Sequence, residues 1–242
     1  MTYCLGILST EGLVLASDSR SNAGVDQVAR VCKLTTLALA GQRMIAILAA
    51  GNLATTQSVV TQVRQSVGSG AVGLDVYAAA TMFDVAGIVG TRLREVVDRD
   101  RKYVEPYGDP TASFLVGGQI AGEPPRLFEI YAAGNFVEAS ERCPFLQIGE
   151  TKYGKPILDR TLRPDSPLDH AAKLALLSFD ATLRSNLSVG PPIDILRYRK
   201  DSFSAAGLET LDDDSPYWSA LRRDYSDGLL SLVERLPPPP EA

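Results

Sequence analysis

The chain has 242 residues, of which 45% are hydrophobic and 22% charged, and its formal net charge is −5. This composition is typical of a globular protein, and the lack of any lysine and arginine cluster argues against nucleic-acid binding. No apolar run reaches about 18 residues and the start of the chain does not resemble a signal peptide, so we expect no membrane contact.

The first half of the chain predicts strands followed by two helices. Each of the first two strands carries apolar residues on both of its faces, which is typical of strands covered on two sides. A loop is expected at 22–27, with Gly24 at a special backbone position. The predicted elements are strands at 3–9, 12–17, 30–39 and 44–50, a helix capped by Asn52, and a longer helix after Asp75 that carries Val76, Ala80, Phe83 and Gly87 on one side.

The second half repeats this order of strands and then helices. Two strands are expected near 112–119 and 126–132, joined by a Gly-Pro-rich segment. A helical stripe follows, made of Ala172, Leu176, Phe179, Leu183 and Leu187. After a strand at 193–199, Ser215-Pro216 is expected to start a last helix that ends before the prolines at 237–240. Trp218 in this helix is expected to belong to the core.

Runs of strands and runs of helices favour an α+β fold over a regular βαβ alternation. Two stacked antiparallel sheets, flanked by helix layers, would explain why the strands are apolar on both faces. We find no repeat and no internal boundary. The sequence therefore predicts one domain over residues 1–236 and a Pro-rich, disordered tail at 237–242.

Cysteine and histidine usage limits the possible chemistry. Cys4, Cys32 and Cys143 show no metal-ligand spacing, and their odd number argues against a complete disulfide framework. We therefore expect a reducing, cytoplasmic location. His170 is the only histidine, which excludes a zinc site built on several imidazoles. Any hydrolytic chemistry is expected to use a base other than imidazole.

Thr2 is a candidate nucleophile. Initiator methionines are generally removed before a small residue, and removal of Met1 would leave Thr2 with a hydroxyl and a free amine. The amine can act as the base that activates the hydroxyl. Many chains begin Met-Thr without any such chemistry, so Thr2 requires support from other residues.

Three further features offer this support. Asp18 ends the second strand of the predicted hairpin, and should therefore lie beside Thr2. Lys33 is expected on a strand, where its ammonium would be held by Asp18 and directed at Thr2, favouring the neutral amine and the deprotonated hydroxyl. The turn at Ala50-Gly51 offers backbone N–H groups to an oxyanion. Each feature also has an ordinary explanation, as a loop cap, an edge lysine and a tight turn respectively.

Together these residues resemble the proteasome-type branch of the N-terminal-nucleophile hydrolases. The match lies in the stretches 15–20, 23–24, 31–33 and 49–51, and the order of elements is similar over nearly the whole chain. The stretches 17–26, 149–156 and 188–192 are most similar to Anbu, the bacterial ancestral β subunit.

The resemblance implies a four-layer αββα sandwich that self-associates into a ring or open spiral. It implies Thr2 as nucleophile, with Asp18 and Lys33 tuning the site and the Ala50 N–H in the oxyanion hole. The reaction would be hydrolysis of a peptide bond through an acyl-enzyme ester, and no metal or organic cofactor is implied. The resemblance leaves open whether the assembly works with an unfoldase partner.

The chain departs from the family pattern at three places. The first glycine of the usual Gly-Gly turn is Ala50, and the usual G-S-G motif appears as Gly149-Glu150-Thr151. The late aspartate–x–x–serine pair keeps only its serine, Ser188, which we carry over as a site residue. We hypothesise that Glu150 takes over part of the support of Thr2; unchanged hydrolysis and labelling in Glu150→Ala would refute this.

Two other functions remain open at this point. One alternative is a scaffold or binding assembly with the same fold and little or no turnover, and the other is a hydrolase of small amides instead of peptides. Retention of Met1 would favour the scaffold, because the amine of Thr2 would then be locked in a peptide bond. Labelling of Thr2 without peptide cleavage would favour the small-amide enzyme.

Overall fold

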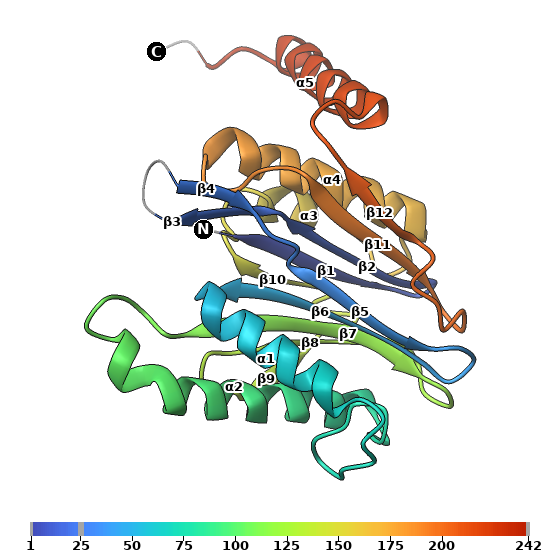
Figure 1. Cartoon of the computed structure of the whole chain (residues 1–242). Helices are drawn as coiled ribbons and strands as arrows, with labels where there is room; N and C mark the ends of the chain where they lie inside the picture. The colour runs from blue at the N-terminus through green and yellow to red at the C-terminus, as the bar shows by residue number, and fades with distance from the viewer. Residues whose placement is uncertain (1, 24–26, 241–242) are drawn as a thin grey trace.

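Two antiparallel sheets face each other at the centre of the computed structural model, which describes residues 2–23 and 27–240 (Figure 1). The first sheet has the order β10–β1–β2–β11–β12, with β10 (Phe145–Gly149), β1 (Tyr3–Ser9), β2 (Gly12–Asp18), β11 (Ile193–Arg199) and β12 (Leu208–Leu211). The second has the order β5–β6–β7–β8–β9, with β5 (Leu34–Leu39), β6 (Arg43–Gly51), β7 (Ala112–Ile120), β8 (Arg126–Ile130) and β9 (Phe136–Glu138).

Helices cover the outer face of each sheet. Figure 1 shows α3 (Lys155–Thr161) and α4 (Leu168–Ser185) on the first sheet, and α1 (Leu53–Ser66) and α2 (Met82–Val104) on the second. A short hairpin of β3 (Arg20–Ala23) and β4 (Gln27–Arg30) extends from the end of β2. The predicted four-layer αββα sandwich is therefore confirmed.

Alternation along β1 explains why this strand is apolar on both faces. Tyr3, Leu5 and Ile7 pack in the cluster formed with α3 and α4, whereas Cys4 belongs to the cluster between the two sheets. A Cβ atom on Gly6 would lie 2.7 Å from a methyl of Leu127. The sheets therefore approach closely at this point, and both faces of β1 are removed from water, as predicted.

The last helix, α5 (Pro216–Arg235), is attached through its first turn. Ser215 accepts a hydrogen bond from the Trp218 N–H, and Pro216 occupies the first helical position. Trp218 is fully buried, which confirms that it belongs to the core. The later apolar residues of α5 are exposed, and no helix in the described chain is long and apolar enough to cross a membrane.

Several predicted boundaries were wrong. The expected strand at 30–39 begins at Leu34, and the expected loop at 22–27 is flanked by the β3–β4 pair; Gly24, together with residues 25–26, lies outside the described residues. The helix expected after Asp75 begins at Met82, because the Asp75 carboxylate accepts backbone N–H bonds within a turn and Thr81 supplies the cap. Leu187 lies beyond the end of α4 and is exposed.

Sequence patterns also missed short elements. β9, β12 and α3 have three, four and seven residues, too few for a clear period, and the five-residue strand β10 was missed as well. In the tail, residues 237–240 follow α5 as exposed chain without helix or strand, and residues 241–242 lie outside the described part.

Candidate active site

Thr2 is held at the edge of the first sheet by its own backbone. The Glu150 N–H donates to the Thr2 carbonyl at 2.7 Å, directly beyond the pair formed by Tyr3 and Gly149. Gly149 has φ of +84°, and a Cβ there would collide with the Thr2 carbonyl. Glycine is therefore required where β10 meets Thr2.

Asp18 lies beside Thr2, as the hairpin predicted. The register pairs Cys4 with Ser17, so that Asp18 comes opposite Tyr3. The Asp18 Oδ1 atom accepts from the Tyr3 N–H at 3.0 Å, and Oδ2 accepts from the Gly190 N–H at 3.2 Å. The carboxylate is completely buried and is thus fixed by backbone donors from two distant parts of the chain.

Lys33 forms the predicted ion pair with Asp18. Its Nζ lies 2.7 Å from Asp18 Oδ1 and 2.6 Å from the Arg20 carbonyl oxygen, and only 7% of the side chain is exposed. The reasoning that placed it was wrong, however, because Lys33 follows β4 and precedes β5 instead of alternating within a strand. Its side chain lines the same cavity as Thr2.

The electrostatics follow from burial. Burial raises the pKa of Asp18, and the Lys33 ammonium and the N–H donors of Tyr3 and Gly190 oppose this rise. Burial also raises the pKa of the Cys4 thiol far above its usual range. Cys4 therefore stays protonated at neutral pH, and it is not a competing nucleophile next to Thr2.

The pairing of β6 with β7 determines which backbone N–H groups near Ala50 are already hydrogen-bonded. The Asn52 N–H donates to the Thr111 carbonyl at 2.9 Å, and hydrogen-bonded pairs alternate along an antiparallel ladder. The N–H of Ala50, two residues earlier, is therefore directed at β7. The N–H groups of Ala49 and Gly51 point to the opposite edge, where Ala49 donates to the Lys33 carbonyl.

Gly51 is the donor that this arrangement leaves free. β5 pairs with β6 only as far as Leu48, so no strand of the described chain covers Gly51 on that edge. Gly51 lines the cavity, has φ of +110°, and precedes the Asn52 cap of α1. The backbone pairing therefore leaves the Gly51 N–H, instead of the predicted Ala50 N–H, available to a bound group, and both residues line the cavity.

Glu150 acts on Thr2 through its backbone, whereas its side chain binds elsewhere. The buried carboxylate accepts from Asn186 Nδ2 at 2.9 Å, and Asn186 Oδ1 accepts from the Ser188 N–H at 2.9 Å. These bonds hold the turn that presents the Gly190 N–H to Asp18. Sequence reasoning gave no role to Asn186 or Gly190, although both lie in or next to stretches that it compared with the family.

Ser188 is not part of the cavity wall. Its N–H donates to Asn186 Oδ1 and its carbonyl oxygen accepts from Asn22 Nδ2 at 3.1 Å, and both bonds are typical of a turn residue. The structure thus brings Thr2, Asp18 and Lys33 together and places Ser188 behind them.

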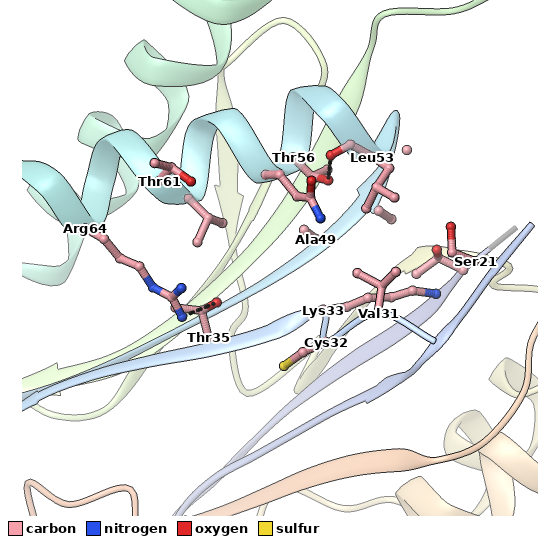
Figure 2. Close-up of a pocket in the computed structure, with 15 residues that line it drawn as sticks. Ser21, Val31, Cys32, Lys33, Thr35, Ala49, Leu53, Thr56, Thr61 and Arg64 are labelled. Carbon is pink, nitrogen blue, oxygen red and sulfur yellow. Dashed lines mark hydrogen bonds between the residues drawn. The ribbon is translucent and has the colours of Figure 1, made fainter. Parts of the chain in front are cut away.

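A cavity of about 350 Å³ opens beside Thr2 (Figure 2). The chain between β4 and β5 forms one side of it, and α1 forms the other. The cavity extends from Thr2 and the Gly51 turn towards Arg64, near the end of α1. Within the described residues, no group of three or more metal-ligating side chains occurs. The site therefore offers a hydroxyl, an ion pair, a turn N–H and a substrate-sized space.

Comparisons with known proteins show to which family the chain belongs. No protein-family model and no curated protein sequence matches the chain. Solved structures do: Anbu (ancestral beta-subunit) from Yersinia bercovieri is 43% identical with a TM-score of 0.93, covering 99% of this chain and 100% of that chain.

Two other solved structures give the same result. The helical assembly of the Anbu complex from Pseudomonas aeruginosa is 46% identical with a TM-score of 0.94, covering 99% of this chain and 98% of that one. Anbu from Hyphomicrobium sp. strain MC1 is 43% identical with a TM-score of 0.90, covering 99% and 100%. Since both sequence and fold agree over the full length, the chain belongs to the Anbu family of proteasome-like N-terminal-nucleophile proteins.

Proposed function

We propose that this protein is a threonine peptidase or amidase in which Thr2 is the nucleophile after removal of Met1, a residue outside the described part of the chain. The observation that carries the proposal is the buried Lys33–Asp18 pair, fixed beside Thr2 at the mouth of a cavity. A buried ion pair is costly unless its geometry is well satisfied, and here four segments of the chain contribute donors to Asp18.

In the proposed reaction, the Thr2 hydroxyl oxygen attacks the substrate carbonyl carbon while its proton passes to the Thr2 amine. The positive charge of Lys33 favours both the neutral amine and the developing alkoxide. The oxyanion that forms is stabilised by the Gly51 N–H and by the positive end of α1.

The intermediate then collapses. The carbon–nitrogen bond breaks, the Thr2 ammonium returns its proton to the departing amine, and an ester remains on the Thr2 oxygen. Water, deprotonated by the same amine, attacks this ester, and the bond between the acyl carbon and the Thr2 oxygen breaks. The amine returns the proton to the Thr2 oxygen, and the acid is released. The balance needs no further reactant, since every proton is carried by Thr2 or by water.

Intact-mass analysis with a peptide epoxyketone or β-lactone tests the proposal. We expect the mass of a chain without Met1, increased by one probe. Thr2→Ala should lose this increase, and Thr10→Ala, at an exposed turn position, should keep it. An unmodified protein that retains Met1 would contradict the proposal and would favour a scaffold. Labelling without cleavage across a broad peptide library would favour a hydrolase of small amides.

We also propose that the protein self-associates into an open spiral or ring. The relative from Pseudomonas aeruginosa was solved as a helical assembly, which supports this proposal. Light scattering coupled to size exclusion should give a mass well above 26.0 kDa. A monomer at micromolar concentration would contradict self-association without touching the proposed chemistry of Thr2.

A further inference from the structure

We propose that the cavity beside Thr2 selects an acidic side chain on the substrate residue that contributes the scissile carbonyl, and that Arg64 binds its carboxylate. This inference rests on the proposed function, because it names the substrate class of the same site. It concerns selectivity rather than the chemical step.

The charge of the cavity wall favours an anion. Among the described residues that line the cavity, Lys33 and Arg64 carry charge, and none is an aspartate or glutamate. Lys33 is already neutralised by Asp18 at 2.7 Å and also binds the Arg20 carbonyl. The uncompensated positive charge of the wall therefore belongs to Arg64.

Arg64 is placed to bind a carboxylate. It is the only charged residue in the sequence of α1, and it lies in the last turn of that helix. Its Nη2 donates to Thr35 Oγ1 at 3.3 Å, and no carboxylate in the described chain lies within ion-pair distance of it. Figure 2 shows the guanidinium of this exposed residue extending from α1 towards Thr35, to which it is hydrogen-bonded.

The remaining walls suit the stem of a long acidic side chain. Val31 and Val60 offer apolar surface for methylene groups, and Thr35 fixes the guanidinium beyond them. A guanidinium presents two parallel N–H donors that match a carboxylate, and it repels a lysine or arginine side chain. An uncharged glutamine of the same shape offers the guanidinium one acceptor oxygen instead of two and no opposite charge.

Arg64 also lies near the C-terminus of α1, where a cation interacts favourably with the helix dipole. That role alone would change the stability of the helix but would not discriminate between probes. Selectivity is therefore the readout that separates the two roles.

The test uses peptide epoxyketones that differ only in the side chain next to the reactive carbonyl. We expect the glutamate probe to modify Thr2 about tenfold faster than the glutamine probe, as for one charge-assisted hydrogen bond, and the arginine probe to react slowest. Arg64→Gln should make the glutamate and glutamine rates equal, and Arg64→Glu should favour the arginine probe. Arg101→Gln, which removes an exposed cation of α2 outside the cavity, should keep the native preference.

Each outcome has a distinct meaning. Equal glutamate and glutamine rates in the native protein, or a preference that persists in Arg64→Gln, would overturn this inference and leave the proposed function standing. Absence of modification by any probe would overturn the proposed function and this inference with it. Melting temperatures of the variants, measured in parallel, identify any that fail to fold.

Discussion

Replacement of Lys33 by methionine removes the cation from a buried ion pair and leaves the Asp18 carboxylate without it. Asp18 is fully buried and the Lys33 side chain is 7% exposed, so that water does not compensate for the loss. Breaking a buried pair by removing one partner typically costs about 3–5 kcal/mol. We expect a loss of this size in the free energy of unfolding at pH 8.

The loss should depend on pH with a defined sign. Burial already raises the pKa of Asp18 in the native protein, and removal of the Lys33 ammonium raises it further. A carboxyl whose pKa is higher in the folded than in the unfolded state contributes stability below its unfolded pKa, and this contribution is lost as pH rises through the folded pKa. Lys33→Met should therefore be less destabilised at pH 5 than at pH 8.

Urea unfolding, followed by circular dichroism at both pH values and at one protein concentration, measures this effect. Asp18→Asn combined with Lys33→Met is the matched control, because it removes the uncompensated charge and should recover part of the lost stability. A penalty below about 1 kcal/mol at pH 8, or an equal penalty at both pH values, would refute the electrostatic reasoning.

Three other substitutions test separate features. Gly149→Ala places a Cβ against the Thr2 carbonyl at φ of +84°, and should cost about 1–3 kcal/mol and abolish probe labelling; retained labelling would contradict the backbone account. Asp75→Asn should lose about 1 kcal/mol at pH 7 in urea unfolding. Burial alone would raise the pKa of Asp75, but backbone N–H bonds lower it below its usual value. The loss of stability in Asp75→Asn should therefore shrink as pH falls towards 3, and a loss that stays constant with pH would refute this account. Trp218→Ala should cost about 3–5 kcal/mol, and an unchanged unfolding midpoint would show that α5 does not depend on it.

The position of Asp18 beside Thr2 was predictable because it follows from a local rule. A two-stranded hairpin places the end of its second strand beside the start of its first, which brought Asp18 to Thr2. The ion pair of Lys33 with Asp18 was also predicted, although Lys33 lies between β4 and β5 and not on the expected strand. The apolar strands likewise predicted the two-sheet sandwich.

The remaining parts of the site depend on tertiary pairing that local patterns do not contain. The choice between Ala50 and Gly51 as oxyanion donor depends on which N–H groups bond to β7, and both residues look equally suitable in sequence. Asn186 and Gly190 reach the site only because β11 pairs with β2. Arg64 lies thirteen residues after Gly51 in the sequence, and both residues line the same cavity as Thr2 only in the folded chain.

The hydrogen bonds of Thr2 and Asp18 join parts of the chain that are synthesised at different times. Thr2 and Asp18 are synthesised before Glu150 and Gly190, whose N–H groups donate to them. A chain synthesised only as far as residue 189 thus contains Thr2, Asp18 and Lys33 without the Gly190 N–H that donates to Asp18. The hydrogen bonds around Thr2 and Asp18 are therefore complete only after Gly190 has been synthesised, when most of the chain already exists.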